Sequence, residues 1–487
     1  MCLDNGGHFK FSLLFLSSFN LRGGYILGRI GGKSMGQKFS LEELRTFFFD
    51  LETRHSVYSL EYRGVFYWKL IRMSLFSHIL KCLGMVEESH PMTSKAKAER
   101  LVRLVKYSGL NILRKRKIQK CDILILTSGR KYYFNGDFVD VYLYDQIQYL
   151  SKNEVSHLIV DRPDHYGRHL GAKLENLVYF EGIRHLVREY PLPFLLPSLK
   201  DSVLEEISEE IKRELGIECD VKLLAERRLF RFSMEKKYFD NLLDKTKPKE
   251  VFLVCSYGKE ELIASAHERA IRVTEVQHGV ISDYHMGYAF PQKIRIPYFP
   301  DRLILFGEYW RECIEYPHNT ELEVGRFSYF RNSSTTNDIK HDERVLFISQ
   351  GAYGKDVSRI AARFATQNKI ECYYKLHPSE FHIWREEYDE LVHCSQVGRI
   401  KVVAEEISLY DLFRHSKYVV GVNSTALFEA LQFDCNVYVL ELEGHQYMKH
   451  LLKGNHAKLI SAEFTVEDLV EFQYMEVTNK EYFFSPL

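Results

Sequence analysis

The chain has 487 residues, of which 45% are hydrophobic and 27% charged, as is ordinary for a globular protein of two or three domains. Lysine plus arginine equal aspartate plus glutamate at 66 each, so the overall charge excludes a protein that is basic all over and predicts no nucleic-acid partner. The nine cysteines form no CxxC pair, which argues against a zinc ribbon or a disulfide framework and favours a cytoplasmic location.

Residues 1–39 are expected to be a poorly ordered N-terminal segment. The run "FSLLFLSSF" (11–19) has the apolar character of a signal-peptide core, but Asp4 precedes it and no small-residue cleavage site follows. We therefore expect no signal peptide, and a natural start at Met35 is an open alternative. No run in the sequence reaches the roughly 18 apolar residues of a membrane span.

Residues 40–120 predict a helical preface. Ser40 and Glu43 have capping-box spacing at the start of one helix, and "YRGVFYWKLIRMSLFSHILKCL" predicts a second. The stretch 93–120 carries ten basic residues and one acid, Glu99, with leucine, valine and isoleucine interleaved. Two interpretations stay open: a solvated helix before a strand, or a basic amphipathic segment lying on the anionic surface of the inner membrane.

Residues 121–330 alternate between short apolar runs and helical segments. The runs are "CDILILT" (121–127), "HLIVD" (157–161), "LVYF" (177–180), "VFLVCSY" (251–257), "IRVTEV" (271–276) and "DRLILFG" (301–307). Continuous apolar runs of this length are typical of buried parallel strands. With helices at 202–216 and 259–269 between them, they predict a Rossmann-like doubly wound domain.

A polar stretch, "RNSSTTNDIKHDE" (331–343), predicts a linker to a second domain of the same kind at 344–470. Its strands are "RVLFIS" (344–349), "IECYYKL" (370–376), "IKVVAE" (400–405), "YVVGV" (418–422) and "NVYVLE" (436–441). Residues 471–487 remain as a C-terminal tail. The predicted fold class is α/β, with two doubly wound parallel-sheet domains that face a cleft.

Ligands of open parallel sheets bind beyond the carboxyl ends of the strands. In the second domain, Ser424 and Thr425 follow such a strand and begin a helix, a pattern that either caps the helix or binds a phosphate. His377 follows another strand in "KLHPSE", two residues after Lys375, and Gly351 lies in the loop "QGAYGKD". We expect these residues on the donor side of the cleft.

In the first domain, the stretch "TEVQHGVISDYHMGY" places His278 directly after a strand. Gly279 permits close approach of a ligand to the backbone, and Asp283 and His285 lie near enough in sequence to share a pocket. The alternative is a packed hairpin without a catalytic role. If the pocket is real, His278 is its acceptor-side residue.

Three motifs, "EVQHG", "YKLHPSE" and "YDLFRHSKYVVGVNSTALFEAL", resemble in order those of metal-independent bacterial glycosyltransferases of the GT-B type that build capsule and surface polysaccharides. The second and third motifs are also similar to those of CDP-glycerol glycerophosphotransferases and bacterial sialyltransferases. The resemblance covers residues 121–470. It implies a nucleotide-activated sugar as co-substrate, a glycan or lipid-linked glycan as acceptor, and neither a metal nor a further cofactor.

On the donor side, the resemblance implies that His377 contacts the donor phosphate and stabilises the departing nucleotide. It assigns the donor phosphate to Ser424 and Thr425, and a ribose or sugar hydroxyl to Glu429. Near the acceptor it makes His278 a candidate base. The acidic base motif of the sialyltransferases has no clean copy here, and Asp137 in "NGDF" is a partial stand-in.

The sequence therefore predicts a cytoplasmic glycosyltransferase, with peripheral attachment to the membrane as a separate hypothesis. Three alternatives stay open. The protein can be a polyol-phosphate transferase of the CDP-glycerol type, a sugar-nucleotide 2-epimerase, or a non-catalytic partner in glycan assembly that docks on the membrane.

Overall fold

The computed structural model describes residues 39–86, 94–114, 118–134, 136–164, 167, 169–170, 176–180, 182, 185, 193–332, 342–470 and 480–485. The expected N-terminal segment, most of the linker and most of the C-terminal tail lie outside the described residues. Residues 115–117 of the basic stretch also lie outside them. None of the described helices combines the length and apolar character needed to cross a bilayer.

Seven parallel strands form the sheet of the first domain, in the order β11-β10-β9-β8-β3-β6-β7. They are β3 (Ile123–Leu126), β6 (His157–Asp161), β7 (Leu177–Tyr179), β8 (Glu250–Val254), β9 (Arg272–Val276), β10 (Arg302–Leu305) and β11 (Glu321–Val324). Each of the six apolar runs contains one strand, as expected. The edge strand β11 was not expected, because its sequence "ELEV" alternates exposed and half-buried residues.

Six parallel strands form the sheet of the second domain, in the order β14-β13-β12-β15-β16-β17. They are β12 (Asp342–Ile348), β13 (Glu371–Lys375), β14 (Lys401–Val403), β15 (Ser416–Gly421), β16 (Asn436–Leu440) and β17 (Lys458–Ile460). In both sheets the order reverses beside the first strand, between β3 and β8 and between β12 and β15. These are the topological switch points at which doubly wound sheets bind ligands. The expected two-domain, GT-B-like fold is confirmed.

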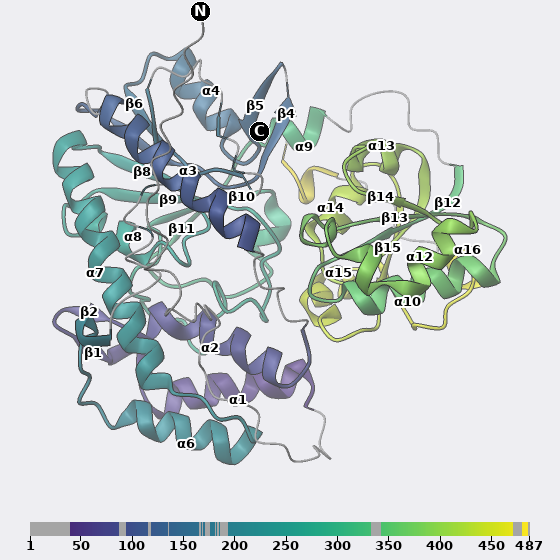
Figure 1. The fold of residues 1–487 in the computed structure, drawn as a ribbon, viewed down its shortest axis with the longest axis horizontal. Helices are drawn as coiled ribbons and strands as arrows, with labels where there is room; N and C mark the ends of the chain where they lie inside the picture. The colour runs from purple at the N-terminus through teal and green to yellow at the C-terminus, as the bar shows by residue number, and fades with distance from the viewer. Residues whose placement is uncertain are drawn as a thin grey trace, which may run out of the picture.

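The remaining elements connect and cover the sheets (Figure 1). In the first domain they are the hairpin β4–β5 (Lys131–Phe134, Asp137–Asp140) and the helices α4 (Tyr144–Lys152), α8 (Glu260–His267) and α9 (Ser328–Asn332). In the second domain they are α10 (Gly354–Gln367), α11 (Trp384–Glu387), α12 (Asp389–Gln396), α13 (Leu409–Arg414), α14 (Thr425–Leu431), α15 (Lys449–Lys453) and α16 (Val466–Val470). The short hairpin β1–β2 (Glu61–Tyr62, Val65–Phe66) packs instead on the helical core described next.

The predicted preface helices form a helical lobe with two later helices. α1 (Leu41–Arg54) and α2 (Trp68–Cys82) share one apolar core with α6 (Val203–Leu215) and the first half of α7 (Val221–Thr246). Figure 1 shows this lobe at one end of the first domain, with α7 running from it along the sheet. The capping box at Ser40 forms as expected, since the Ser40 amide donates to Glu43 Oε2 at 2.7 Å.

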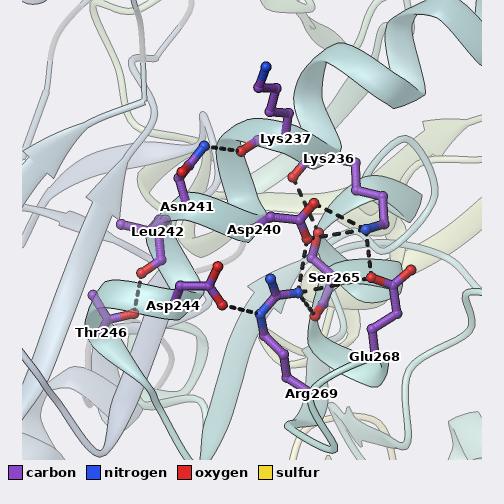
Figure 2. A network of polar contacts seen from close by, with 10 residues as sticks. All are labelled: Lys236, Lys237, Asp240, Asn241, Leu242, Asp244, Thr246, Ser265, Glu268 and Arg269. Atoms are coloured by element: carbon purple, nitrogen blue, oxygen red, sulfur yellow. Dashed lines mark hydrogen bonds and ion pairs between the residues drawn. The ribbon is translucent and has the colours of Figure 1, made fainter.

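Charged side chains join the far half of α7 to α8 (Figure 2). Arg269, just beyond α8, donates from Nε to Asp244 Oδ1 at 2.8 Å and from Nη1 to Asp240 Oδ1 at 2.9 Å. Lys236 Nζ donates to Glu268 Oε2 at 2.6 Å. These bonds hold α7, which enters the helical lobe, against a helix that packs on the sheet.

Helix α3 (Ser94–Leu113), which contains much of the basic stretch, lies along the edge strand β7. Asn111 Nδ2 donates to the Tyr179 carbonyl at 2.7 Å, and the Tyr179 amide donates to Asn111 Oδ1 at 2.9 Å. Arg114 Nη1 donates to the Leu177 carbonyl at 2.9 Å. The helix thereby satisfies backbone groups at a sheet edge, where unpaired groups invite aggregation.

The two domains are joined by a cluster of rings that we call the aromatic seam: Tyr309, Trp310, Phe428 and Phe483. The Trp310 and Phe428 ring centroids lie 4.6 Å apart, and those of Tyr309 and Phe483 lie 4.9 Å apart. Trp310 Nε1 donates to the Phe483 carbonyl at 2.9 Å. The C-terminal residues therefore return to the first domain after the second domain is complete.

The ion pair between Arg72 and Glu52 offers a test of the helical lobe. Both side chains are fully buried, and Arg72 Nε donates to Glu52 Oε1 at 2.6 Å. Glu52→Gln leaves the guanidinium without a carboxylate in the core, so we expect a loss of about 3–5 kcal/mol in the free energy of unfolding. Urea denaturation measures this loss.

The control is Asp122→Asn, which removes the partner of Lys249, a side chain that is 83% exposed. Exposed pairs contribute little, so its unfolding midpoint should match that of the wild type. Equal midpoints for Glu52→Gln and Asp122→Asn would contradict a structural role for the buried pair.

Candidate active site between the two domains

The turn after β9 holds His278 in one position. The fully buried Gln277 donates from Nε2 to the Gly279 carbonyl at 2.9 Å and accepts at Oε1 from the Phe306 amide at 2.8 Å. The Gln277 side chain therefore links the Gly279 carbonyl, just after His278, to the backbone just after β10. A rigid turn fixes the direction of the imidazole, as catalytic positioning requires.

Two tyrosines contact the imidazole of His278. Tyr257 Oη lies 2.9 Å from Nε2, and Tyr288 Oη lies 3.4 Å from Nδ1. Tyr288 also donates to Glu275 Oε1 at 2.5 Å. The proton arrangement that satisfies all three contacts has Nδ1 of His278 protonated and Nε2 accepting from Tyr257. Nε2 is therefore the atom able to accept a proton.

The surroundings keep both histidines of this loop neutral. Burial lowers the pKa of His278 to about 3, and the nearby His285 and Arg130 act in the same direction. Burial also lowers the pKa of His285 to about 4, to which Lys69 contributes. Burial raises the pKa of the Glu275 carboxyl. A neutral imidazole among cations is a weak base, and an anion bound nearby would strengthen it.

Gly351, His377 and Ser424 follow the carboxyl ends of β12, β13 and β15, on both sides of the switch point of the second sheet. A Cβ added at Gly351 would lie 2.3 Å from Ser379 Oγ and 3.4 Å from His377 Nδ1, so the first two loops touch. The exposed His377 accepts at Nδ1 from the Ser379 amide at 3.2 Å. In its neutral form the ring therefore presents Nε2–H as a donor.

The loop at Ser424 lies against the loop of the first domain. Ser424 Oγ accepts from the Ala426 amide at 3.2 Å and caps α14. A Cβ added at Gly279 would lie 3.7 Å from Thr425 Oγ1, which is ordinary van der Waals contact. The glycine beside His278 and the threonine at the start of α14 are thus neighbours across the domain boundary.

Glu429 lies at the boundary between the two domains. Its side chain is 2% exposed, and Oε2 accepts from Tyr410 Oη at 2.8 Å. Oε1 lies 3.7 Å from Nη2 of Arg130, whose Nη1 donates to Tyr142 Oη at 2.6 Å. In this structure Glu429 joins the two domains through Arg130.

Asp283 also bridges parts of the molecule. Its carboxylate lies 3.6 Å from His450 Nε2 in the second domain, and its carbonyl accepts from Arg45 Nε of the helical lobe at 2.8 Å. The nearby His450 imidazole holds the pKa of the Asp283 carboxyl below its usual range. Asp137 lies at the start of β5 and accepts from the Phe138 amide at 2.8 Å. Lys375 ends β13, where burial lowers the pKa of its amine.

Sequence reasoning missed Tyr257, Tyr288, Glu275 and Arg130, all of which surround His278. Tyr257 lies just beyond the carboxyl end of β8, so the strand-end rule applied to "CSYGKE" would have selected it. Arg130 lies four residues beyond the end of β3, but nothing in its sequence neighbours marks it. Among the described residues, no group of three or more histidines, cysteines, aspartates and glutamates is arranged to hold a metal ion.

The fold defines a two-domain α/β protein of the GT-B kind. Residues 334–444 match the family described as "Capsule polysaccharide biosynthesis protein", so the resemblance to capsule biosynthesis proteins is confirmed, with the match lying in the second domain. No curated protein matches the sequence significantly.

Several solved structures are similar to the chain at low sequence identity. UDP-GlcNAc 2-epimerase of Methanocaldococcus jannaschii, in complex with UDP-GlcNAc and UDP, is 11% identical, covers 75% of this chain and 96% of its own, and has a TM-score of 0.43. A ugt transferase from Siraitia grosvenorii in complex with UDP is 11% identical, covers 74% and 90%, and has a TM-score of 0.38. Acinetobacter baumannii MurG is 9% identical, covers 71% and 88%, and has a TM-score of 0.36.

The low pKa of His278 has a measurable consequence for stability. The folded protein keeps His278 neutral down to about pH 3, whereas an unfolded chain binds the proton near pH 6.5. Stability is therefore lost as the pH falls below 6.5. Between pH 7.5 and 5.0 the His278→Asn variant should lose about 2 kcal/mol less unfolding free energy than the wild type, measured by urea denaturation.

The exposed histidine on α12, His393, provides the matched control. His393→Asn should lose as much stability as the wild type over the same pH interval. An identical pH dependence in His278→Asn would contradict a buried, neutral imidazole at this position.

Proposed function

We propose that the protein is a glycosyltransferase that moves a sugar from a nucleotide-activated donor to a growing capsular or surface polysaccharide. The observation that carries the proposal is the approach of Gly279 to Thr425, which sets His278 beside the start of α14. An acceptor-side imidazole and a donor-side strand-to-helix turn then lie at one boundary. The family match of the second domain supports the capsule pathway.

On the donor side, the hydroxyls of Ser424 and Thr425 and the Nε2–H of His377 are the donors available to a diphosphate. Negative charge grows on this group as the bond to the sugar breaks. Donors held in place before the reaction stabilise such charge without reorganising, which is the main source of rate enhancement in many enzymes. The proposed chemistry needs no metal, and the nucleotide sugar is a substrate.

On the acceptor side, we assign proton transfer to Nε2 of His278, either directly or through the Tyr257 hydroxyl that now occupies it. The donor's phosphates bring negative charge to a site where burial, with a further contribution from His285 and Arg130, holds the imidazole pKa low. That charge raises the basicity of His278 when the donor is bound, so the base becomes effective with both substrates in place.

The assignment is tested with purified protein and a panel of CMP-, CDP-, UDP- and GDP-linked donors. His377→Ala removes a donor to the leaving group, so we expect transfer to fall about 100- to 1,000-fold. His278→Asn removes the base, so we expect a fall of about 100- to 10,000-fold. Product analysis by mass spectrometry measures both and identifies the group that is moved.

His393→Asn is again the control and should transfer at the wild-type rate. Unchanged turnover in both site variants would contradict the assignment. Transfer of a polyol phosphate, or conversion of a UDP-sugar without an acceptor, would replace the proposed reaction by one of the alternatives with the same fold.

We also propose that α3 attaches the protein to an anionic membrane surface. Five large apolar side chains of α3 are strongly exposed: Leu101 46%, Val102 68%, Val105 53%, Ile112 73% and Leu113 78%. Their spacing places them on one helical face, while Leu104, on another face, is buried. The exposed Lys106 lies beside this face, and an apolar face with basic residues next to it is the pattern of helices that lie in the membrane interface.

The triple substitution Val102→Ser, Ile112→Ser and Leu113→Ser tests this attachment. Each substitution removes apolar area that would otherwise leave water, so we expect sedimentation with phosphatidylglycerol vesicles to weaken at least about tenfold. Val397→Ser, at a 57% exposed position after α12, should change nothing. Equal binding of all three proteins would rule out attachment through α3.

A further inference from the structure

A cavity of about 260 Å³ lies in the first domain. Its walls come from the residues that follow β6, β7 and β8 and from helices α3 and α7. Five of the described lining residues are cationic: Arg100, Arg162, Arg228, Arg231 and Lys259. Two are acidic, Glu235 and Glu261. Its lining therefore carries an excess of positive charge in a protein whose overall charge is zero.

The position of the cavity is that of a ligand site. In the first sheet the strand order reverses between β3 and β8, and Lys259 lies five residues beyond the end of β8. Arg162 follows β6 directly. Doubly wound sheets bind ligands in the crevice at such a switch point, beyond the carboxyl ends of the strands.

Two cations of the cavity, Lys259 and Arg162, lie close to each other. Burial lowers the pKa of the Lys259 amine to about 8, and the neighbouring Arg162 acts in the same direction. Arg228 is fixed by donation from Nε to the Leu70 carbonyl at 2.8 Å and lies 3.7 Å from Glu260. Cations gathered in a partly buried space repel one another, and a bound anion relieves this repulsion.

One short loop connects the cavity to the candidate base. Tyr257, whose hydroxyl lies 2.9 Å from Nε2 of His278, stands two residues before Lys259, and Gly258 between them also lines the cavity. Two lining residues of the cavity therefore directly follow, in sequence, the tyrosine that contacts the candidate base. The donor-side residues Ser424 and His377 belong to the other domain.

We propose that this cavity binds a phosphate or diphosphate group of the acceptor, so that the enzyme selects a phosphorylated acceptor. This inference rests on the proposed glycosyl transfer. Arginine and lysine side chains bind phosphate oxygens through charge-assisted hydrogen bonds, and a cavity of this size holds several water-sized groups. The bound phosphate would anchor the acceptor while its hydroxyl reaches His278.

The first experiment measures binding of inorganic pyrophosphate by calorimetry in the absence of any donor. Arg100→Gln with Lys259→Gln removes two cations while keeping similar side-chain volume, and we expect affinity to fall at least about tenfold. Lys249→Gln, at the other end of β8, is the matched control and should bind like the wild type. A thermal melt of each variant verifies that it is folded.

Pyrophosphate can also occupy the donor site, so Ser424→Ala with Thr425→Val is titrated in parallel. If only this donor-side variant loses binding, the inference is overturned. Lys259→Arg, which keeps the charge, should restore most of the affinity that Lys259→Gln alone loses. Equal affinity in the wild type and the Arg100→Gln, Lys259→Gln variant also overturns it.

The second experiment compares transfer to a phosphorylated acceptor glycan with transfer to the same glycan without phosphate. Loss of the two cations should raise KM for the phosphorylated acceptor at least about tenfold and leave kcat and the unphosphorylated acceptor unaffected. If KM rises equally for a lipid-linked and a soluble phosphorylated glycan, the cavity recognises the phosphate alone. A response of the lipid-linked one only would place the lipid's headgroup there.

The proposed reaction and the proposed anion site can be contradicted independently of each other. If the protein binds pyrophosphate through Arg100 and Lys259 but transfers no sugar, the anion site is supported and the proposed reaction is contradicted. If the wild type and the variant both transfer sugar equally fast to the two acceptors, the proposed reaction is supported and the acceptor site is contradicted.

Discussion

The packing of α14 on the aromatic seam is the interaction on which the rest of the arrangement depends. Phe428 of α14 lies against Trp310 of the first domain, with ring centroids 4.6 Å apart. The same short helix carries Thr425 at its start and Glu429 beside Arg130. Burial of large rings supplies most of the attraction, and the polar contacts then fix the orientation. Helix α14 thus determines how the loops at the carboxyl ends of the strands in the two domains face each other.

The helical lobe supports the same boundary from the other side. Arg45 donates to the Asp283 carbonyl at 2.8 Å, and Arg72 donates to the Met286 carbonyl, so both bind the backbone of the loop that follows His278. The carboxylate of Asp283 in turn faces His450 of the second domain. The lobe therefore holds the loop after His278 in position through these two hydrogen bonds. This gives the preface a function that its amphipathic helices alone did not indicate.

Charge is distributed unevenly over a chain that is neutral overall. Arg130 lies near His278, cations line the cavity beside Lys259, and the exposed Lys106 lies beside the exposed apolar face of α3. Each location suits an anion of a different kind: the donor phosphates, a phosphate on the acceptor, and the lipid surface. Burial and the nearby Arg130 keep the pKa of His278 low, and an anion bound beside it would raise its basicity, which couples catalysis to occupancy.

The sequence by itself determined the two parallel sheets and the strand-end positions of His278, His377 and Ser424. Continuous apolar runs report burial on both faces of a strand, and the residues that follow such runs must lie at one edge of the sheet. It did not reveal β11, whose edge position permits a polar sequence. Only the tertiary structure decided that Glu429 ties the domains and that Tyr257 reaches His278. Those contacts join residues that are distant along the chain, and local periodicity carries no information about such pairs.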